Sequence, residues 1–405
     1  MQPSFRGKCH AAYGGPLKFR TATLQILFWF CAAIVVYVYA GYPLVLASGL
    51  LGRRRPTAPA GDTTVGLPPL SIIVAAHNEE SAIEAKIQNI FASDYPRERL
   101  EILVGSDGSS DRTEEIVRKY SGDGVGLVSF PMQQGKSAIQ NGLVTAASGE
   151  VLVFTDADCE FDPRALRALV AHFEDPEVGL VTGAPAYANE HENSVTANEG
   201  VYLRYETRLR REESERGLLA MASGSLFAVR HSLWRPLDRQ LGDDFELPLR
   251  VALAGFRNVL EPAAQTITRL SQNSAASMFA LKVRIISKDF RAIRTYKSVL
   301  NPFRRRDFAL SLWSHKLLRW LVPYFLIGML VTSGFLLRIP FYRAVFAAEI
   351  GLCAIAAFGL LFESKRLGFP WSIATSFCIV NLAAFFGTLR SLGRRGSGSW
   401  TPVRS

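Results

Sequence analysis

The stretch EVLVFTDADCE, residues 150–160, decides the fold expected for the centre of this chain. It opens with an apolar run rich in β-branched and aromatic residues, as in a buried strand, and ends with two aspartates, Asp156 and Asp158. Similar runs occur around it: SIIVAA (71–76), EILVGS (101–106), VGLVSF (125–130) and VGLVTG (178–183). Longer segments of helical pattern separate them. This alternation predicts an α/β domain with a mostly parallel sheet.

Long apolar segments flank this domain. The chain has 405 residues, and residues 21–52 contain no charged side chain, which predicts a transmembrane helix over 24–51. About three more membrane helices are predicted within 312–392, near 317–337, 341–361 and 369–390. The remaining boundaries are a tail at 1–23, a proline-rich linker at 52–69, the α/β domain at 70–272, a basic connector at 273–311 and a tail at 393–405.

The formal net charge of +10 is concentrated beside the apolar segments, as in Arg53–Arg55 and Arg304–Arg306. Basic flanks are typical of cytoplasmic membrane surfaces and attract anionic lipids, so we expect a multi-pass protein of the cell membrane with its α/β domain in the cytoplasm. With the α/β domain in the cytoplasm, four spans would place both termini outside the cell. Both tails are basic, which opposes this trend, so two alternatives remain open: four true spans, or one apolar segment that is interfacial or re-entrant. No zinc-finger, RNP or helix-turn-helix signature indicates a nucleic-acid partner.

Residues 275–297 combine helical apolar spacing with six basic side chains. Two interpretations remain open for this segment. It is either a basic amphipathic helix on the membrane surface or an ordinary helix on the surface of the α/β domain, and the membrane helices that follow favour the first.

Acidic residues follow three of the predicted strands. Asp107 and Asp111 with Glu114 are also explained as a turn and a helix cap. Asp156 and Asp158 differ, because residues two apart in an extended segment point to the same side, where two carboxylates repel unless a cation intervenes. Mg²⁺ or Mn²⁺ is suited to such a site, since these ions are held by one or two carboxylates and substrate phosphates.

Two further segments fit a phosphate-binding site. Gly135 permits close backbone approach and Lys136 places a cation at a predicted helix start, although Phe130 rules out a Walker A loop. Asp243 and Asp244 open another helix, either as favourable N-terminal charges or as carboxylates that include a base near the metal.

This ordered set resembles the membrane-embedded branch of the family 2 glycosyltransferases of the GT-A fold, which includes cellulose, chitin and hyaluronan synthases. The matching motifs are AAHNEE (75–80), SDGSSD (106–111), QGKS (134–137) with NG (141–142), TDAD (155–158), SGSLFAVRH (223–231) and GDDFELPLRVALAGFR (242–257). The resemblance covers residues 70–265. It implies metal-dependent, inverting transfer of a sugar from a nucleotide-sugar donor, expected to be a UDP-sugar, to a lipid or glycan acceptor.

The resemblance also implies roles for individual residues. The implied donor contacts are Ala75, His77, Glu79, Asp107, Lys136 and Asp156; the metal ligands are Asp158 and Asp156; the acceptor contacts are Ser223, Gly224 and Ser225. Asp244 would be the general base, with Asp243 in the acidic position before it.

One feature departs from the processive synthases of this family. Their Gln-x-x-Arg-Trp motif has no counterpart in residues 282–296, KVRIISKDFRAIRTY, where Arg284 is a candidate contact for the diphosphate, with Lys282 as the alternative. Single-sugar transfer and processive elongation therefore both remain open. The rival interpretations are a nucleotidyltransferase and a catalytically inactive sugar- or lipid-binding membrane protein.

Overall fold

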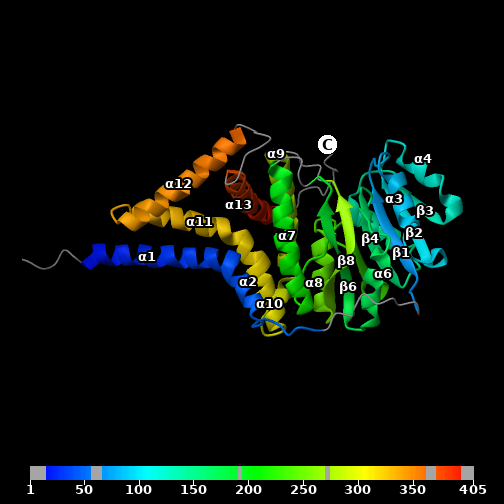
Figure 1. Ribbon diagram of the computed structural model, residues 1–405, viewed down its shortest axis with the longest axis horizontal. Helices are drawn as coiled ribbons and strands as arrows, with labels where there is room; N and C mark the ends of the chain where they lie inside the picture. Colours follow the sequence, from blue (N-terminus) through cyan, green and yellow to red (C-terminus); the bar gives the residue numbers. More distant parts are fainter. Residues whose placement is uncertain (1–14, 56–65, 190–193, 270–273, 362–370, 394–405) are drawn as a thin grey trace, which may run out of the picture.

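The computed structural model describes residues 15–55, 66–189, 194–269, 274–361 and 371–393. The outer parts of both predicted tails, most of the predicted linker (56–65) and the charged turn at 362–370 lie outside the described residues. Figure 1 shows two parts: an α/β domain, and a set of long helices that extends away from it.

The α/β domain is built on an eight-stranded sheet of order β3-β2-β1-β4-β7-β6-β8-β5. Its parallel half consists of β1 (Leu70–Ala76), β2 (Leu100–Asp107), β3 (Val125–Phe130) and β4 (Val151–Asp156). In the register of the sheet, Ala75 of β1 pairs with both Gly105 of β2 and Asp156 of β4. The carboxyl ends of these strands therefore meet at one edge of the sheet.

The other half of the sheet is mixed. β7 (Leu226–Arg230) runs antiparallel to both β4 and β6 (Val178–Tyr187), β8 (Arg257–Thr268) runs parallel to β6, and β5 (Cys159–Phe161) runs antiparallel to β8. The α/β class and all five predicted strands are confirmed, but the parallel arrangement is limited largely to one half of the sheet.

Helices cover both faces of the sheet because successive strand residues point to opposite faces. Ile72 and Val74 of β1 belong to the core beneath α3 (Ile83–Phe91), α4 (Thr113–Arg118) and α6 (Ala165–Ala171). Ile73 and Ala75 belong to the core beneath α5 (Lys136–Val144) and α8 (Asp243–Leu253). Short 3₁₀ segments occur at Arg97–Arg99, Ser121–Asp123, His172–Glu174, His231–Leu233 and Lys297–Leu300.

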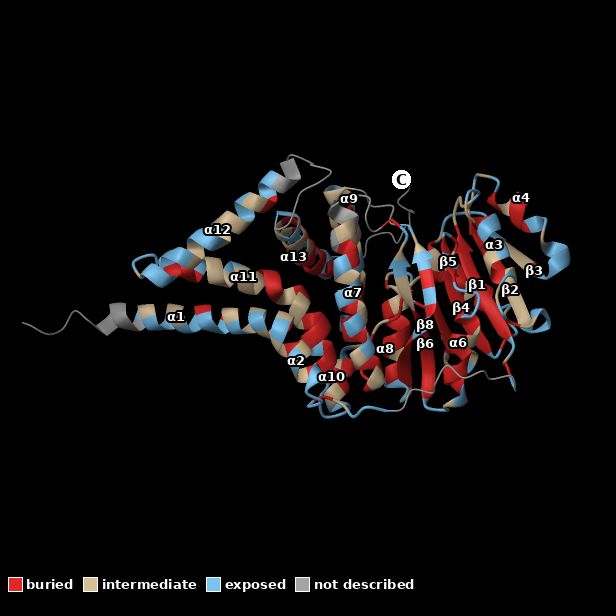
Figure 2. Cartoon of the chain, viewed as in Figure 1, coloured by how far each residue is buried: buried red, intermediate tan, exposed pale blue. Residues whose placement is uncertain are grey.

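Four helices among the described residues are long and apolar enough to cross a membrane: Arg20–Ala47, Arg306–Phe335, Pro340–Phe358 and Ile373–Leu392. The first joins α1 (Gly15–Val36), a π-helical turn (Tyr37–Gly41) and α2 (Tyr42–Ala47). The second joins α10 (Arg306–Leu312), a π-helical turn (Trp313–Leu317) and α11 (Leu318–Phe335), and so begins earlier than predicted. α12 (Pro340–Leu361) and α13 (Trp371–Leu392) follow. In Figure 2 the strands are largely buried, whereas α1 and α12 carry many exposed positions.

Two helices connect these parts of the molecule, α7 (Ser194–Glu215) and α9 (Ala275–Thr295). The basic segment predicted at 275–297 forms α9, which packs along α13. Phe279 and Phe386 meet edge to face with ring centroids 6.0 Å apart, and Arg294 donates to the carbonyl of Ser391 near the end of α13. α9 is therefore packed against a candidate membrane helix, while its other face turns toward α8.

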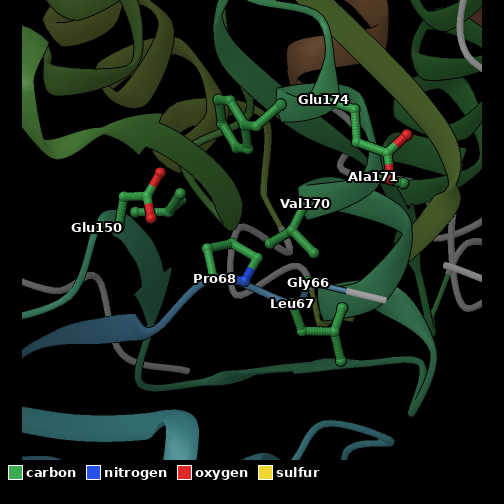
Figure 3. A pocket seen from close by; sticks show the side chains of 9 residues that line it. Gly66, Leu67, Pro68, Glu150, Val170, Ala171 and Glu174 are labelled. Atoms are coloured by element: carbon green, nitrogen blue, oxygen red, sulfur yellow. The ribbon is translucent and has the colours of Figure 1, made fainter. Parts of the chain in front are cut away.

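A hollow of about 160 Å³ lies at the amino ends of β1 and β4, between Leu67, Pro68 and Val170 (Figure 3). The carboxylates of Glu150 and Glu174 stand at its rim. Because Glu150 precedes β4 and Asp156 ends it, the hollow is separated from the acidic strand ends by the length of the strand.

A buried cluster of charged side chains fastens α7 to the helices that follow α9. His315 lies between two glutamates of α7, with Nδ1 2.7 Å from Oε1 of Glu213 and Nε2 3.1 Å from Oε1 of Glu206. Lys316 and Arg319 donate to Glu206 at 2.7 and 2.9 Å. Removing one member of such a buried set leaves uncompensated charge in a poorly solvated place.

Replacing Glu206 with alanine is therefore expected to lower the free energy of unfolding by about 3–5 kcal/mol, the usual cost of breaking a buried ion pair from one side. Thermal unfolding of the purified chain in detergent measures the change. The control is Glu98→Ala on the exposed surface, with an expected effect within about 0.5 kcal/mol. Equal unfolding midpoints for the two variants would show that the cluster does not fasten α7.

Candidate active site

The candidate site lies at the carboxyl ends of the parallel strands, where ligands bind in open α/β sheets. Its centre is the ammonium of Lys136, the first residue of α5. Nζ of Lys136 lies 2.7 Å from Oδ1 of Asp156 at the end of β4 and 3.2 Å from Oδ2 of Asp243 at the start of α8. Burial opposes the charged form of Lys136, but these two carboxylates outweigh it and raise its pKa. One cation thus holds together residues from three separate segments.

The loop before Lys136 is held by Asp107. The buried Asp107 carboxylate accepts hydrogen bonds from the backbone N–H groups of Gln134 at 2.6 Å and Gly135 at 2.9 Å. Gly135 has φ of +93°, a conformation that residues with a side chain rarely adopt. The structure therefore places Asp107 where it orients the backbone that presents Lys136; its contact with the donor stays a prediction.

Asp243 and Asp244 stand side by side at the start of α8 in different environments. Asp243 accepts a hydrogen bond of 2.7 Å from Nε2 of Gln140. Burial opposes its ionisation, but Lys136 and Gln140 prevail and the pKa of Asp243 is lowered. Burial and the charge of Asp243 raise the pKa of Asp244 to about 6. The pair therefore combines a firmly ionised carboxylate with one that exchanges a proton near neutral pH, as a general base requires.

Gly224 marks the space between the two acidic segments. A Cβ added at this glycine would lie 3.9 Å from Oδ2 of Asp244 and 4.0 Å from Oδ2 of Asp156. Beside it, the hydroxyls of Ser223 and Ser225 are 2.8 Å apart. Asp156 and Asp244 thus lie on either side of Gly224 in the predicted acceptor segment, and a larger residue at 224 would narrow the opening between these two carboxylates.

The end of β4 fits a divalent cation. Asp158 is exposed, and Asp156 is partly exposed with Oδ1 on Lys136 and Oδ2 toward the opening at Gly224. No group of three or more His, Cys, Asp and Glu side chains able to hold a metal occurs in the described part of the chain. Asp156 and Asp158 could each supply a carboxylate ligand to such a cation, with further ligands from water and a phosphate-bearing substrate, as is typical of Mg²⁺.

The loop after β1 is tied to the loop after β2. Nδ1 of His77 lies 2.6 Å from the backbone oxygen of Asp107, and the backbone N–H of Glu79 donates to Oγ1 of Thr113 at 2.7 Å. Asn78 takes a left-handed conformation with φ of 55° and accepts from the backbone of Ser110. These contacts place Ala75 to Glu79 at the correct edge of the sheet, and their contact with the donor remains a prediction.

α9 brings further charged side chains to this opening. Arg284 and Lys288 are one helical turn apart on α9, and burial lowers the pKa of both. The charge of Asp244 opposes this shift at Arg284, and the charges of Asp243 and Asp244 oppose it at Lys288. The adjacent Asp289 is buried, and a Cβ added at Gly242 would lie 2.8 Å from Oδ1 of Asp244 and 3.5 Å from Oδ1 of Asp289. Lys288 and Asp289 were missed by sequence reasoning. A lysine followed by an aspartate in an amphipathic helix gives no local signal, and only the packing of α9 beside α8 reveals them.

This architecture is the GT-A fold. The chain superposes on mannosyltransferase PcManGT from Pyrobaculum calidifontis, solved in complex with GDP-Man and Mn²⁺, with a TM-score of 0.69 and 23% sequence identity. The match covers 90% of this chain and 99% of the other. It shows a shared fold that takes in most of the chain, long apolar helices included.

The family follows from the sequence of the domain. Residues 71–235 match the family described as Glycosyl transferase family 2, the family that the motifs of the α/β domain resemble. It is 27% identical over 247 residues to the β-monoglucosyldiacylglycerol synthase of Synechocystis sp., covering 58% of this chain and 51% of that protein. It is 32% identical over 215 residues to the probable glycosyltransferase YdaM of Bacillus subtilis, covering 49% and 50%. The chain thus spans about half the length of these relatives.

Replacing Gly224 with alanine tests the opening. The new Cβ would meet only ordinary contacts, so the unfolding midpoint is expected to stay nearly unchanged. Because the methyl group would stand between Asp156 and Asp244, we expect sugar transfer to fall on the order of 10- to 100-fold. Gly122→Ala is the matched control, since nothing lies within 4 Å of its added Cβ. Equal activities of the two variants would show that reacting groups do not occupy this space.

Proposed function

We propose that this chain transfers a sugar from a nucleotide-diphosphate donor to a hydroxyl group of a lipid or glycan acceptor at the membrane, with inversion at the anomeric carbon. The observation that carries this proposal is the position of Lys136, held between Asp156 and Asp243, with Asp244 facing the same opening. Such a site pairs a cation suited to phosphate oxygens with a carboxylate suited to a hydroxyl proton.

The donor would lie along the carboxyl ends of β1, β2 and β4. Lys136 would stabilise the negative charge that grows on the departing diphosphate, and Arg284 and Lys288 of α9 would add to this effect. Asp156 and Asp158 would hold a divalent cation, which when bound supplies Lewis-acid neutralisation of phosphate charge. The loop of residues 77–79 would border the nucleotide.

The acceptor would enter beside Ser223–Ser225, with its hydroxyl directed at Asp244. Asp244 would take the hydroxyl proton as the acceptor oxygen forms its bond to the anomeric carbon and the bond to the diphosphate breaks. Attack from the face opposite the leaving group gives inversion without a covalent intermediate on the protein. The raised pKa of Asp244, about 6, suits it to accept a proton and to release it again near neutral pH.

The arrangement of the helices supports a membrane acceptor. α9 packs on α13 and brings Asp289 beside Gly242 and Asp244, so the site lies next to a helix that contacts a candidate membrane helix. Arg53–Arg55 and Arg304–Arg306 stand at the ends of candidate spans that adjoin the α/β domain (Figure 1). Basic residues there favour a cytoplasmic location for the domain in a multi-pass membrane protein.

A screen of radiolabelled UDP- and GDP-sugars with the purified chain in lipid, with and without Mn²⁺ or Mg²⁺, tests the proposed reaction. We expect one donor class to label a lipid or glycan product, and removal of divalent cations with EDTA to abolish the labelling. Failure of every donor to be consumed with metal present would favour a binding protein that lacks catalysis.

Substituting Asp244 tests its role as the base. Asp244→Asn keeps the size of the side chain but cannot accept the proton, so we expect transfer to fall on the order of 10²- to 10⁴-fold while donor binding persists. The matched control is Asp123→Asn on the exposed surface, with unchanged activity. An Asp244→Asn variant with full turnover would remove Asp244 from this role.

The pH dependence gives a separate prediction. A base works when deprotonated, so kcat/KM should decline as the pH falls through about 6 and level off above it. Because the charge of Asp243 helps to raise the pKa of Asp244, Asp243→Asn should move this acid limb to lower pH, whatever the remaining rate. An acid limb that moves to higher pH, or does not move, would contradict the assigned interaction.

A further inference from the structure

Lys86 of α3 is a fully buried lysine beneath the aspartate-bearing turn. It is 1% exposed and points away from solvent toward the strand ends. Nζ lies 2.7 Å from Oγ1 of Thr155, 2.8 Å from the backbone oxygen of Cys159 and 3.6 Å from Sγ of Cys159, and it stands 4.5 Å from the centre of the Phe161 ring. Three acceptors match the three N–H donors of an ammonium group, and the ring face favours a cation.

These contacts enclose the aspartate pair. Thr155 and Cys159 stand on either side of the segment Asp156–Asp158, the first at the end of β4 and the second at the start of β5. Lys86 therefore binds both ends of the turn from within the core. Its position fixes how far apart the two ends are, and so constrains the backbone that carries both carboxylates.

The same contacts reach the predicted acceptor segment. Oγ1 of Thr155 donates to the backbone oxygen of Ser225 at 2.9 Å, and Sγ of Cys159 donates to the same oxygen at 3.1 Å. Lys86 thus secures a junction of β4, β5 and the loop at residues 223–225. Asp158 on the turn is exposed, whereas Lys86 is buried.

Burying an ammonium group is costly, and an apolar side chain at this position of α3 would avoid that cost. Burial lowers the pKa of Lys86, whereas its contacts with Cys159 and the charges of Asp156 and Asp158 favour the ammonium form. A side chain that only packs in the hydrophobic core needs neither a charge nor three directed hydrogen bonds. The arrangement is that of a group whose hydrogen bonds set the shape of the turn.

We propose that Lys86 is a positioning residue for the metal-binding turn, one that holds Asp156 and Asp158 in the arrangement a divalent cation requires. This role rests on the proposed function of Asp158 as a metal ligand. Lys86 itself would touch neither metal nor substrate. It would act as the outer groups of metal sites do, whose loss commonly weakens metal affinity or activity 10- to 100-fold.

The test is Mn²⁺ binding by the full chain in lipid nanodiscs, with UDP or GDP present, followed by the electron paramagnetic resonance of free Mn²⁺. Lys86→Met keeps the length of the side chain and removes the ammonium, and we expect the apparent Kd for Mn²⁺ to rise 10- to 100-fold. Thr155→Val removes one acceptor and should give a smaller rise of several-fold. If Lys86→Met does not fold, the Mn²⁺ affinity of Thr155→Val still tests the positioning role, because this variant loses one of the hydrogen bonds of Lys86.

Ile87→Ala is the matched control. Ile87 is the next residue of α3, is fully buried and belongs to the core on that face of the sheet, so its truncation destabilises the fold but leaves the hydrogen-bonding groups of Lys86, Thr155 and Cys159 in place. We expect it to lower the unfolding midpoint and leave Mn²⁺ affinity unchanged. If Ile87→Ala weakens Mn²⁺ binding as much as Lys86→Met, the effect is one of general stability and the positioning role is overturned.

Asp158→Asn separates this role from the metal site itself. We expect it to abolish measurable Mn²⁺ binding. If Asp158→Asn does so while Lys86→Met and Thr155→Val bind Mn²⁺ as the unchanged chain does, the role of Lys86 is overturned and the metal site stands. If Asp158→Asn binds Mn²⁺ normally, the assigned metal site is wrong, and the role of Lys86 with it.

Discussion

The structure depends on one ammonium group placed among carboxylates. Lys136 lies between Asp156 and Asp243, and Asp244 faces the same opening. Two like charges about 4 Å apart repel by about 4 kcal/mol at the effective dielectric constant typical near a protein surface, so this grouping needs a cation at its centre. The position of Lys136 is set in turn by the hydrogen bonds from Asp107 to the backbone of Gln134 and Gly135. A strand end, a loop and two helix starts therefore converge on one point.

The helices outside the α/β domain also contribute to the surroundings of Lys136 and Asp244. α9 contacts α13 through Phe279 and Arg294 and carries Arg284, Lys288 and Asp289 near Asp244. The α7 cluster around Glu206 and His315 fastens the domain to the second candidate span. An acceptor that reaches Asp244 from the membrane would therefore meet a cationic helix face held by the membrane helices themselves. This geometry links the proposed chemistry to the proposed location.

Much of this site could be predicted because its signals are local. Apolar runs that end in Asp107 or Asp156 indicate strands and their carboxyl ends, and Asp243 and Asp244 before an apolar helical pattern indicate a helix start. β5, β7 and β8 were missed because β5 has only three residues, β7 only five, and β8 carries polar residues and Pro262 within its length. Lys86 and Asp289 were missed for another reason. Both lie in amphipathic helices, where a charged residue normally faces water, and only tertiary packing buries them.

The products released from the donor test the central claim most directly. Incubating the full chain in lipid with an accepted nucleotide sugar and Mn²⁺, and following phosphorus by NMR, identifies which bond is broken. Sugar transfer through the Lys136 and Asp244 site predicts free nucleoside diphosphate in an amount equal to the glycosylated product. Release of pyrophosphate would contradict it, because cleavage would then have occurred within the phosphate chain, as in a nucleotidyltransferase.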